Sequence, residues 1–525
     1  MRRRSFLGAL AAGAALTAAA PAALGRTRTE RRATELDPTA TLDAPGVSEA
    51  VVGDDGRYVY GAAQDSLLVA DFEDPSAPTT VTEAEPTVGD DALTGVQDVA
   101  VSGDRALVAG PPGFLRDGQT AGAALFDVSD PTDPEQVAAV PTDHAVHNLH
   151  LDGDTAYLTG SRLPEEPVLV YDVGDDSPEP VAEWSVVDAV PEWGGVGGSV
   201  YQCHDVVATG DRLYVAYWDA GTWILDVSDR SDPTPVASIG GVDPEDADGG
   251  IADIVQLPGN SHYARPSPDG DLLAVGREAW DRDRGDDRYG GPGSIDLYDV
   301  SDETDPSFLA ALRPPVVEDA DGDNHVNTAH NFGFRGRRLY ASWYTGGVRV
   351  YDLSAPTDPE TLGWWAAPGD ASFWTARPIP DGFVASSVTD PSAGRDANEN
   401  YAEATLYAFP EPDGDAAASA ETLTVDETGM PESPPDYDLP ATSEESETTD
   451  AAATTDAAGT TPQRTTAQTT GDAGTTGATP DGTTATGSTP ADDSTGGGVP
   501  GFGVGAAVAG GALAAYHRVR SGDEQ

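Results

Sequence analysis

The feature that most constrains the fold of this chain is a pattern that occurs seven times between about Val47 and Phe409. The clearest part of each copy is an apolar strand that ends in aspartate and is followed by a turn. Strong copies end at Asp127, Asp226, Asp299 and Asp352, weaker ones at Asp71 and Asp172, and the last has Ala408 in this place. Such repetition indicates supersecondary units that each need a neighbour to bury their apolar face.

Each copy is predicted to form four short strands. In the fourth copy we place them at residues 203–208, 213–217, 222–226 and 235–239. The Ser-Asp-x-x-Asp-Pro segment after the third strand is turn chemistry, because Asp and Ser bond local backbone and Pro presets φ. Short, evenly spaced strands favour an all-β fold, a seven-bladed β-propeller of four-stranded blades. A long β-sandwich is the alternative.

These features also resemble a known repeat family. The Asp-Val-Ser-Asp-Pro turns, the preceding apolar strand and a leading His-Asp or His-Asn pair, as in His204-Asp205, resemble the LVIVD repeat. That family consists of secreted or surface proteins of bacteria and archaea, so the resemblance implies a propeller at the cell surface. It implies no reaction.

Composition narrows the classes of partner. The chain has 525 residues and a net charge of −62, and its 28 basic residues are all arginine. Binding of nucleic acid by counterion release is therefore excluded. Acidic residues scattered over every loop are typical of halophilic proteins, whose charges are screened at molar salt. The single cysteine, Cys203, excludes an intrachain disulfide.

The N-terminal end is interpreted as an export signal. Arg3 and Arg4, followed by Phe6-Leu7 and an Ala-rich run, resemble a twin-arginine signal peptide over residues 1–25, which implies export in the folded state. Residues 26–43 are predicted to be a linker, and residues 44–426 the propeller.

The C-terminal end is interpreted as a stalk and a sorting signal. Residues 427–499 are rich in Thr, Ala and Asp, and we expect them to be disordered. Residues 500–525 begin with Pro-Gly-Phe and resemble a PGF-CTERM tail of haloarchaeal surface proteins, which implies cleavage and attachment of a lipid. As a helix, the apolar run to Tyr516 would cover roughly 23 Å, less than the hydrocarbon core of about 30 Å. A weak membrane anchor that stays in place is the alternative.

Histidines are the strongest functional signal. Aligning the copies on their first turn puts His147, His204, His262 and His330 in one column, with Gln97, Trp374 and Ser48 in the other copies. This column lies at the start of the innermost strand, near one mouth of the channel. Imidazole nitrogens there would suit Zn or Cu, and also Fe or Ni. The alternative is that the histidines are structural residues of the repeat.

Strand alternation predicts on which strand face the residues next to the column lie. Asn148, Asp205 and Asn331 follow a histidine and are therefore expected on the opposite strand face, away from any ligand. Cys203 is expected to be a buried structural thiol for the same reason. His144, His150 and His325 lie close enough in sequence for supporting contacts to the column.

The loops between the second and third strands are expected to open toward the same mouth. Trp218, Glu278 and Tyr344 in these loops are possible ligand-binding residues. Gln97 and Trp374 of the column are added to this set. The insertion from Arg277 to Gly293 also has a simpler interpretation as a solvated halophilic loop. No sequence motif of a serine hydrolase, a phosphate-binding loop or a zinc protease is present.

The sequence is compatible with two functions. The first is a surface-anchored propeller that binds an envelope component or a small ligand, with a metal site at the channel mouth as an added possibility. The second is a copper- or zinc-dependent oxidoreductase or metal-binding protein that uses the four aligned histidines. The chain is similar to the copper-binding methanethiol oxidase family only in blade count and inner-strand histidines.

Ring closure can also be predicted. The last repeat needs a fourth strand, and Glu421–Val425 is the simplest choice, with Leu36–Leu42 as a second possibility.

Overall fold

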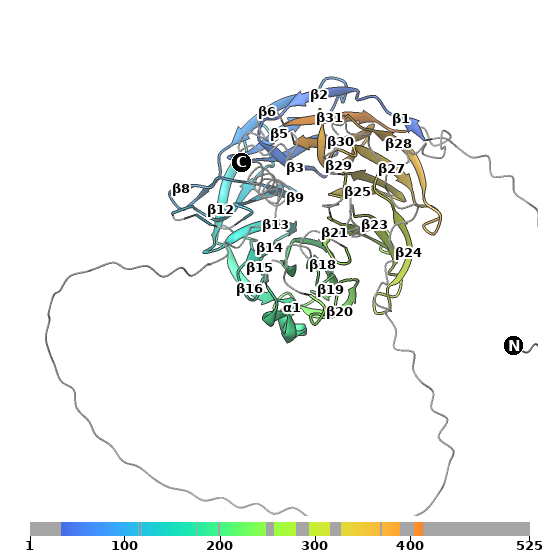
Figure 1. Cartoon of the computed structure of the whole chain (residues 1–525). Helices are drawn as coiled ribbons and strands as arrows, with labels where there is room; N and C mark the ends of the chain where they lie inside the picture. Colours follow the sequence, from blue (N-terminus) through green and yellow to red (C-terminus); the bar gives the residue numbers. More distant parts are fainter. Residues whose placement is uncertain are drawn as a thin grey trace, which may run out of the picture.

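The protein is a seven-bladed β-propeller. The computed structural model describes residues 33–412, except 114, 117, 176, 198–199, 248–256, 280–292, 316–326, 368–369 and 389–403. Seven antiparallel blades surround a central channel (Figure 1). The first strands of neighbouring blades contact one another, so these strands line the channel. The predicted fold class is confirmed.

The blades follow chain order, and their strands are given from the innermost outward. Blade one contains β3 (Val47–Val52), β4 (Tyr58–Ala63), β5 (Ser66–Asp71) and β6 (Thr79–Ala84). Blade two contains β9 (Asp98–Ser102), β10 (Arg105–Gly110), β11 (Gly122–Asp127) and β12 (Glu135–Pro141). Blade three contains β13 (Ala145–Asp152), β14 (Thr155–Ser161), β15 (Val168–Asp172) and β16 (Glu179–Trp184). Blade four contains β17 (Asp205–Thr209), β18 (Arg212–Ala216), β19 (Thr222–Asp226) and β20 (Thr234–Ile239). Blade five contains β21 (Ser261–Pro266), β22 (Leu272–Arg277), β23 (Ile295–Asp299) and β24 (Ser307–Leu312). Blade six contains β25 (Phe332–Arg335), β26 (Arg338–Ser342), β27 (Val348–Asp352) and β28 (Glu360–Trp365), with β1 (Thr34–Glu35) added at its outer edge. Blade seven contains β29 (Ser372–Ile379), β30 (Gly382–Val388), β31 (Thr405–Pro410) and β2 (Ala40–Asp43).

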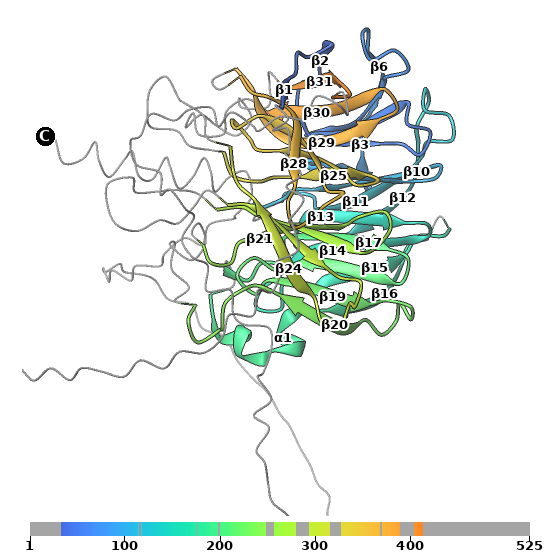
Figure 2. The same ribbon diagram turned by 90° about the vertical axis from the view of Figure 1, so that its right-hand side faces the viewer.

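The N-terminal segment closes the ring. Strand β2 pairs antiparallel with β31 as the outer strand of blade seven, and both views show the two side by side (Figure 1; Figure 2). Strand β1 adds a short parallel pairing to β28 of blade six. Residues 34–43 are thus part of the propeller, and their assignment to a linker at 26–43 is corrected. The outer position is taken by β2, which overlaps Leu36–Leu42, the second possibility named for ring closure. Glu421–Val425, the first choice, lies outside the described residues.

Among the described residues, two short segments with secondary structure of their own lie between blades. A hairpin of β7 (Thr87–Val88) and β8 (Asp91–Ala92) separates blades one and two. Helix α1 (Val186–Ala189), capped by the hydroxyl of Ser185, and a 3-10 helix at Pro191–Gly195 lead from blade three to blade four. Within the described residues, no helix is long and apolar enough to span a bilayer.

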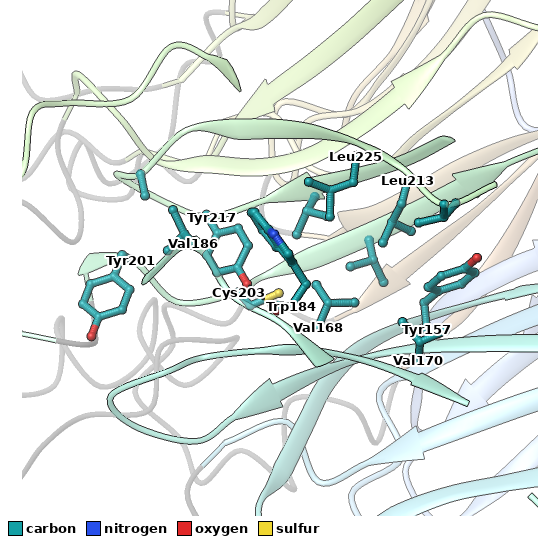
Figure 3. Packing of buried hydrophobic residues seen from close by; sticks show 14 of the residues in the cluster. Tyr157, Val168, Val170, Trp184, Val186, Tyr201, Cys203, Leu213, Tyr217 and Leu225 are labelled. Carbon is teal, nitrogen blue, oxygen red and sulfur yellow. Dashed lines mark hydrogen bonds between the residues drawn. The ribbon is translucent and has the colours of Figure 1, made fainter. Parts of the chain in front are cut away.

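The core lies between adjacent blades. Between blades three and four, Trp184 meets Tyr217 edge to face at 5.8 Å, and Cys203 lies fully buried beside them (Figure 3). Burial raises the pKa of the Cys203 thiol well above its usual value. Cys203 is thus buried, as predicted from the sequence, although it precedes β17 and is not part of a strand. Fully burying one large apolar side chain contributes about 1.5–3 kcal/mol, and every blade interface holds several.

The blade corners have the turn chemistry expected from the sequence. In blade four, Asp226 Oδ1 accepts hydrogen bonds from the Ser228 amide at 2.9 Å and the Ser228 hydroxyl at 2.6 Å. Asp229 bonds Ser231 in the same way, at 3.0 and 2.6 Å. Asp299 repeats the arrangement in blade five, with Ser301. These bonds span two residues, so local sequence is sufficient to specify them.

Candidate functional site

The histidine column lies on an irregularity of the inner strands. The pairing of the first two strands shifts register between Val146 and Leu149 in blade three, and between Ser261 and Tyr263 in blade five. The same shift occurs in blades one and seven, around Ser48 and Trp374. An extra residue in one strand breaks the two-residue alternation of side chains.

This irregularity corrects the prediction made from strand alternation. Asn148 and Asn331 line the same small cavity as the four histidines, although each follows a histidine directly. Alternation would have placed them on the opposite strand face. In blade three the extra residue allows two successive side chains of one strand to face the cavity, whereas Asn331 precedes β25, where strand alternation does not apply.

The four histidines form a continuous row across blades three to six. The ring centroids of His147 and His204 lie 4.3 Å apart, those of His204 and His262 4.3 Å, and those of His262 and His330 4.4 Å. Each residue is only 2% exposed. We call His147, His204, His262 and His330 the histidine row. The alignment of the repeats correctly predicted that they lie together.

Most rings of the row are oriented by main-chain carbonyls of other blades. The Nδ1 of His147 lies 3.1 Å from the carbonyl oxygen of Pro112, and that of His330 lies 2.6 Å from the carbonyl of Trp374. The Nδ1 of His204 lies 3.3 Å from the carbonyl of His262. A carbonyl can only accept, so Nδ1 carries the proton in these three rings and Nε2 keeps its lone pair. This is the orientation found in metal-ligating histidines.

Two imidazole nitrogens of the row lack a hydrogen-bond partner within the described residues. They are Nε2 of His204 and Nδ1 of His262, and both are shielded from solvent. A buried polar atom without a partner costs about 1–3 kcal/mol. Such atoms in a functional protein call for an explanation, and a bound ion is one.

Glu278 completes a set of three ligand atoms. Its Oε2 lies 3.4 Å from Nε2 of His262, and one atom each from His204, His262 and Glu278 lie within 4.8 Å of one another. It is the only such set of His, Cys, Asp or Glu in the described part of the chain. Around it the row leaves a cavity of about 10 Å³, room for roughly one water molecule or one ion.

Glu278 directly follows β22, and Trp218 and Tyr344 lie two residues after β18 and β26, in the corresponding loops of blades four and six. The loop alignment named all three as possible ligand-binding residues, but the sequence assigned Glu278 no metal role. Comparing these loop positions between blades would have placed a carboxylate beside the histidine column.

The two aromatic loop residues pack on the row. Trp218 stacks on His204 with centroids 4.7 Å apart, and Tyr344 meets His330 edge on at 4.7 Å. Both have positive φ, 43° and 48°. Each pairs with the next blade just before its column residue, Trp218 with Ser261 and Tyr344 with Phe373. This backbone contact turns the side chain over the row.

Tyr344 also holds the carboxyl group in place. Its hydroxyl donates to Oε1 of Glu278 at 2.5 Å, which leaves Oε2 facing His262. Trp374, the column residue of blade seven, ends the row with its ring 4.2 Å from that of His330. Glu278, Tyr344 and Trp374 all line the cavity.

Burial keeps this site uncharged near neutral pH. Desolvation lowers the pKa of His147 to about 4 and that of His330 to about 3. It also lowers the pKa of His204 and of His262 well below the usual value, and the neighbouring histidines add to this effect. Burial raises the pKa of Glu278 to about 8, partly offset by the bond from Tyr344. The imidazoles are therefore in the neutral form that binds metals.

Other residues named from the sequence lie elsewhere. Gln97 does not line the cavity, and its carbonyl accepts a 2.7 Å bond from the Ser48 hydroxyl across blades one and two. His144 bonds the carbonyl of Ala145, and His150 lines a separate, wider cavity. Neither supports the row directly. His325 lies outside the described residues.

The geometry can now be set beside known proteins. A scan against protein families matches residues 202–239, the main part of blade four, to the LVIVD repeat. Blade four is an LVIVD repeat. The predicted resemblance is confirmed there, and that LVIVD repeat carries both His204 and Trp218. A search of curated proteins finds no match.

Solved structures show distant likeness in fold. The β-propeller domain of Cps50 (Swd1) from Myceliophteria thermophila is 13% identical, with 71% of this chain and 99% of that chain covered at a TM-score of 0.49. The WD40 propeller domain of Doa1 is 12% identical, covering 73% and 99% at 0.43. A functionally unknown protein from Desulfotomaculum acetoxidans is 11% identical, covering 61% and 84% at 0.42. At these identities the likeness concerns the fold alone.

Proposed function

We propose that this chain is an exported, surface-anchored propeller that binds one transition-metal ion through His204, His262 and Glu278. The observation that carries the proposal is the set of three buried ligand atoms within 4.8 Å of one another. Two of its imidazoles have a nitrogen without a hydrogen-bond partner in the described residues. A purely structural role explains the Nδ1 bonds to carbonyls but leaves these two nitrogens unexplained.

Two imidazoles and one carboxylate suit Zn²⁺, Cu²⁺ or Fe²⁺ better than Ca²⁺ or Mg²⁺, which prefer oxygen ligands. His147 and His330 flank the set at ring contact and extend the nitrogen-rich wall. When bound, such an ion supplies Lewis-acid or redox chemistry.

A metalloenzyme is the second candidate. Three protein ligands leave a coordination position open, as in catalytic zinc sites. The cavity of about 10 Å³ beside the ligands admits water but no larger substrate in this arrangement. Binding therefore has more support than turnover of an organic substrate.

The metal site can be tested with purified protein. The protein is stripped with a chelator and titrated with Zn²⁺ and Cu²⁺ in molar KCl, and metal content is measured by elemental analysis. We expect about one tightly bound ion per chain. His204→Ala, His262→Ala and Glu278→Gln should each weaken binding at least tenfold, because each removes one of three ligands.

His144→Ala is the matched control, since His144 is buried but does not line the cavity. It should bind metal like the wild type. Equal metal content in the wild type and in all three ligand variants would leave the histidine row as a structural device of the repeat.

The location rests on the terminal sequences, which lie outside the described residues. Export requires Arg3 and Arg4, and lipid exchange requires Pro500-Gly501-Phe502. Protein recovered from the cell surface should then lack both the signal peptide and the final apolar segment. Mass spectrometry that finds peptides C-terminal to Phe502 on surface protein would contradict the sorting signal.

A further inference from the structure

The channel contains a second cavity that adjoins the one at the histidine row. Its volume is about 330 Å³, within the range of roughly 300–1,000 Å³ typical of small-molecule sites. Asn331 lines both cavities. We call the second one the channel cavity, and the titratable side chains of the inner strands that line it are Asp98, His150, Asp205, Arg265 and Arg377.

The two aspartates of the channel cavity already have hydrogen-bond partners. Asp98 accepts from the backbone N–H groups of Val99 at 2.8 Å and of Leu149 at 2.7 Å. Asp205 accepts from one backbone N–H at 2.6 Å and from the amide of Asn148 at 2.7 Å. In both aspartates the two bonds go to different carboxyl oxygens, so neither side chain needs a ligand.

Arg377 is matched by a carboxylate. It donates to one oxygen of Glu49 at 2.8 Å, and the two side chains are only 9% and 2% exposed. The other oxygen of Glu49 accepts from the amide of Asn331 at 2.9 Å. These groups satisfy one another and form a fixed part of the wall.

Arg265 differs from all of these groups. It lies on β21, and its Nη1 donates to the hydroxyl of Tyr263 at 2.8 Å. Within the described residues this is its only hydrogen bond, and it forms no ion pair there. A guanidinium has five N–H donors, so Nε and Nη2 of Arg265 keep donors that no acceptor in the described part of the chain takes.

Two positive groups converge beside this cavity. The hydroxyl of Tyr263 also accepts from Arg377 at 3.0 Å, so two guanidinium groups bond the same neutral oxygen. The Tyr263 ring is fixed by Phe332, which it meets edge to face at 4.8 Å. Like charges repel strongly where water is scarce, and Glu49 balances only one of the two. An anion in the cavity would balance the other.

The pKa values of neighbouring side chains agree with a positive wall. Desolvation lowers the pKa of His150 to about 3, and the charges of Arg265 and Arg377 lower it further. Desolvation also raises the pKa of Asp98 to about 8 and that of Asp205 well above its usual value. At neutral pH these carboxyl groups therefore supply no full countercharge to Arg265.

Blade six leaves the space between the two arginines open. Arg265 and Arg377 occupy equivalent positions of β21 and β29, three residues after the column residues His262 and Trp374. Gly333 of β25 lines the cavity between these blades. A Cβ at this position would lie 3.3 Å from Cδ of Arg377. The glycine thus leaves room for the Arg377 side chain and for the cavity beside it.

We propose that the channel cavity binds a small oxyanion, a carboxylate or phosphate group, at the free N–H groups of Arg265. A guanidinium presents its N–H groups in a planar fork that matches two oxygens of either group. Arg377 adds a second positive charge, and no existing hydrogen bond has to break. The site uses no ligand atom of the histidine row and does not need the metal proposed there.

Calorimetry with metal-free protein tests this proposal. The full chain is stripped with a chelator, so that no anion binds through a metal ion, and is titrated in molar KCl with inorganic phosphate, acetate or succinate. At least one of these anions should show one saturable site per chain. Binding of phosphate alone assigns a phosphate ligand, and binding of acetate or succinate assigns a carboxylate. The surface contributes little, because its net charge of −62 repels anions.

Two variants make the result specific. Arg265→Met removes the free donors and should weaken binding at least tenfold. Arg313→Met is the matched control, since Arg313 is exposed and does not line the cavity, and it should bind like the wild type. Thermal unfolding of the wild type gives a readout that needs no variant, because a ligand of the folded state raises the unfolding midpoint.

A saturable site that persists in Arg265→Met would overturn the proposal. A wild type with neither a saturable site nor a higher unfolding midpoint in any of the three anions would overturn it as well, and would mean that Asp98 or Asp205 balances Arg265. An equal loss in Arg313→Met would assign binding to general charge rather than to the cavity, which is a third way for the proposal to fail.

Discussion

Aspartate side chains occur in two opposite environments in this protein, at the exposed blade corners and buried beside the channel. Asp226 and Asp299 lie at the surface and bond Ser residues two positions away. Hydrogen bonds from those serines lower the pKa of both corner aspartates. Asp98 and Asp205 are buried and bond residues of other blades. Desolvation raises the pKa of Asp98 to about 8 and that of Asp205 well above its usual value.

The difference shows that net charge alone says little about the role of an acid in this chain. Several exposed aspartates close the blade corners by accepting hydrogen bonds from residues two positions away. A few reach the channel because the propeller brings seven inner strands together there. Those few are costly for folding, and they are therefore the acids for which a ligand or partner is expected.

The largest effect is expected where a channel carboxylate loses its cation. Arg377→Met leaves Glu49 buried and unpaired, and breaking a buried pair costs about 3–5 kcal/mol of unfolding free energy. The comparison is Arg162→Met, which breaks the half-exposed pair with Glu183 at 2.6 Å and should cost about 0–1 kcal/mol. Denaturant unfolding in molar KCl measures both.

Adding Glu49→Gln to Arg377→Met should recover part of the loss, because the double variant buries no unpaired charge. If the two single Arg variants lose the same stability, the channel does not differ energetically from the surface, and the contrast between the two regions is wrong.

A smaller effect is expected in the pH dependence of stability. A carboxyl with a folded-state pKa of about 8 holds its proton in the folded protein while the unfolded chain has released it above about 4. Stability therefore falls as the pH rises from about 4 to about 8, by at most about 1.4 kcal/mol per pH unit for one proton. Asp98→Asn should flatten this slope in thermal unfolding between pH 5 and pH 9.

The corner aspartates have the opposite sign. Their lowered pKa gives stability that is complete above about pH 4 and lost only as the pH falls further. They add no slope between pH 5 and pH 9. A slope that Asp98→Asn does not change would show that Asp98 is ionised in the folded protein under these conditions.

The smallest effect is expected at a single corner. Asp299→Ala removes the acceptor for the Ser301 amide and hydroxyl, and one such turn should be worth about 1 kcal/mol or less. Asp299→Asn keeps the acceptor oxygen and should stay closer to the wild type at pH 7. A loss as large as that of Arg377→Met would mean that corner turns control the stability of whole blades.

Local sequence was sufficient for much of the fold. The corner turns, the four strands of blade four and the number of blades followed from residues that lie close together along the chain. The histidine column also followed from the repeat, because equivalent positions of a closed ring share one radius and one level. The burial of the Cys203 thiol was also predicted, although Cys203 precedes β17 and lies outside any strand.

Only the tertiary structure decided the remaining features. The sequence offered two strands for closing blade seven, and the tertiary structure decided for β2 (Ala40–Asp43), which overlaps the second possibility, Leu36–Leu42. The register shift in blade three brought Asn148 beside the histidines, and Asn331, which precedes β25, lies there as well, against the alternation that the sequence suggests. Glu278 reached His262 through a loop whose role depends on its position above the channel. The pairing of β2 with β31 joins residues far apart in the chain, and it exists only when the ring of seven blades closes.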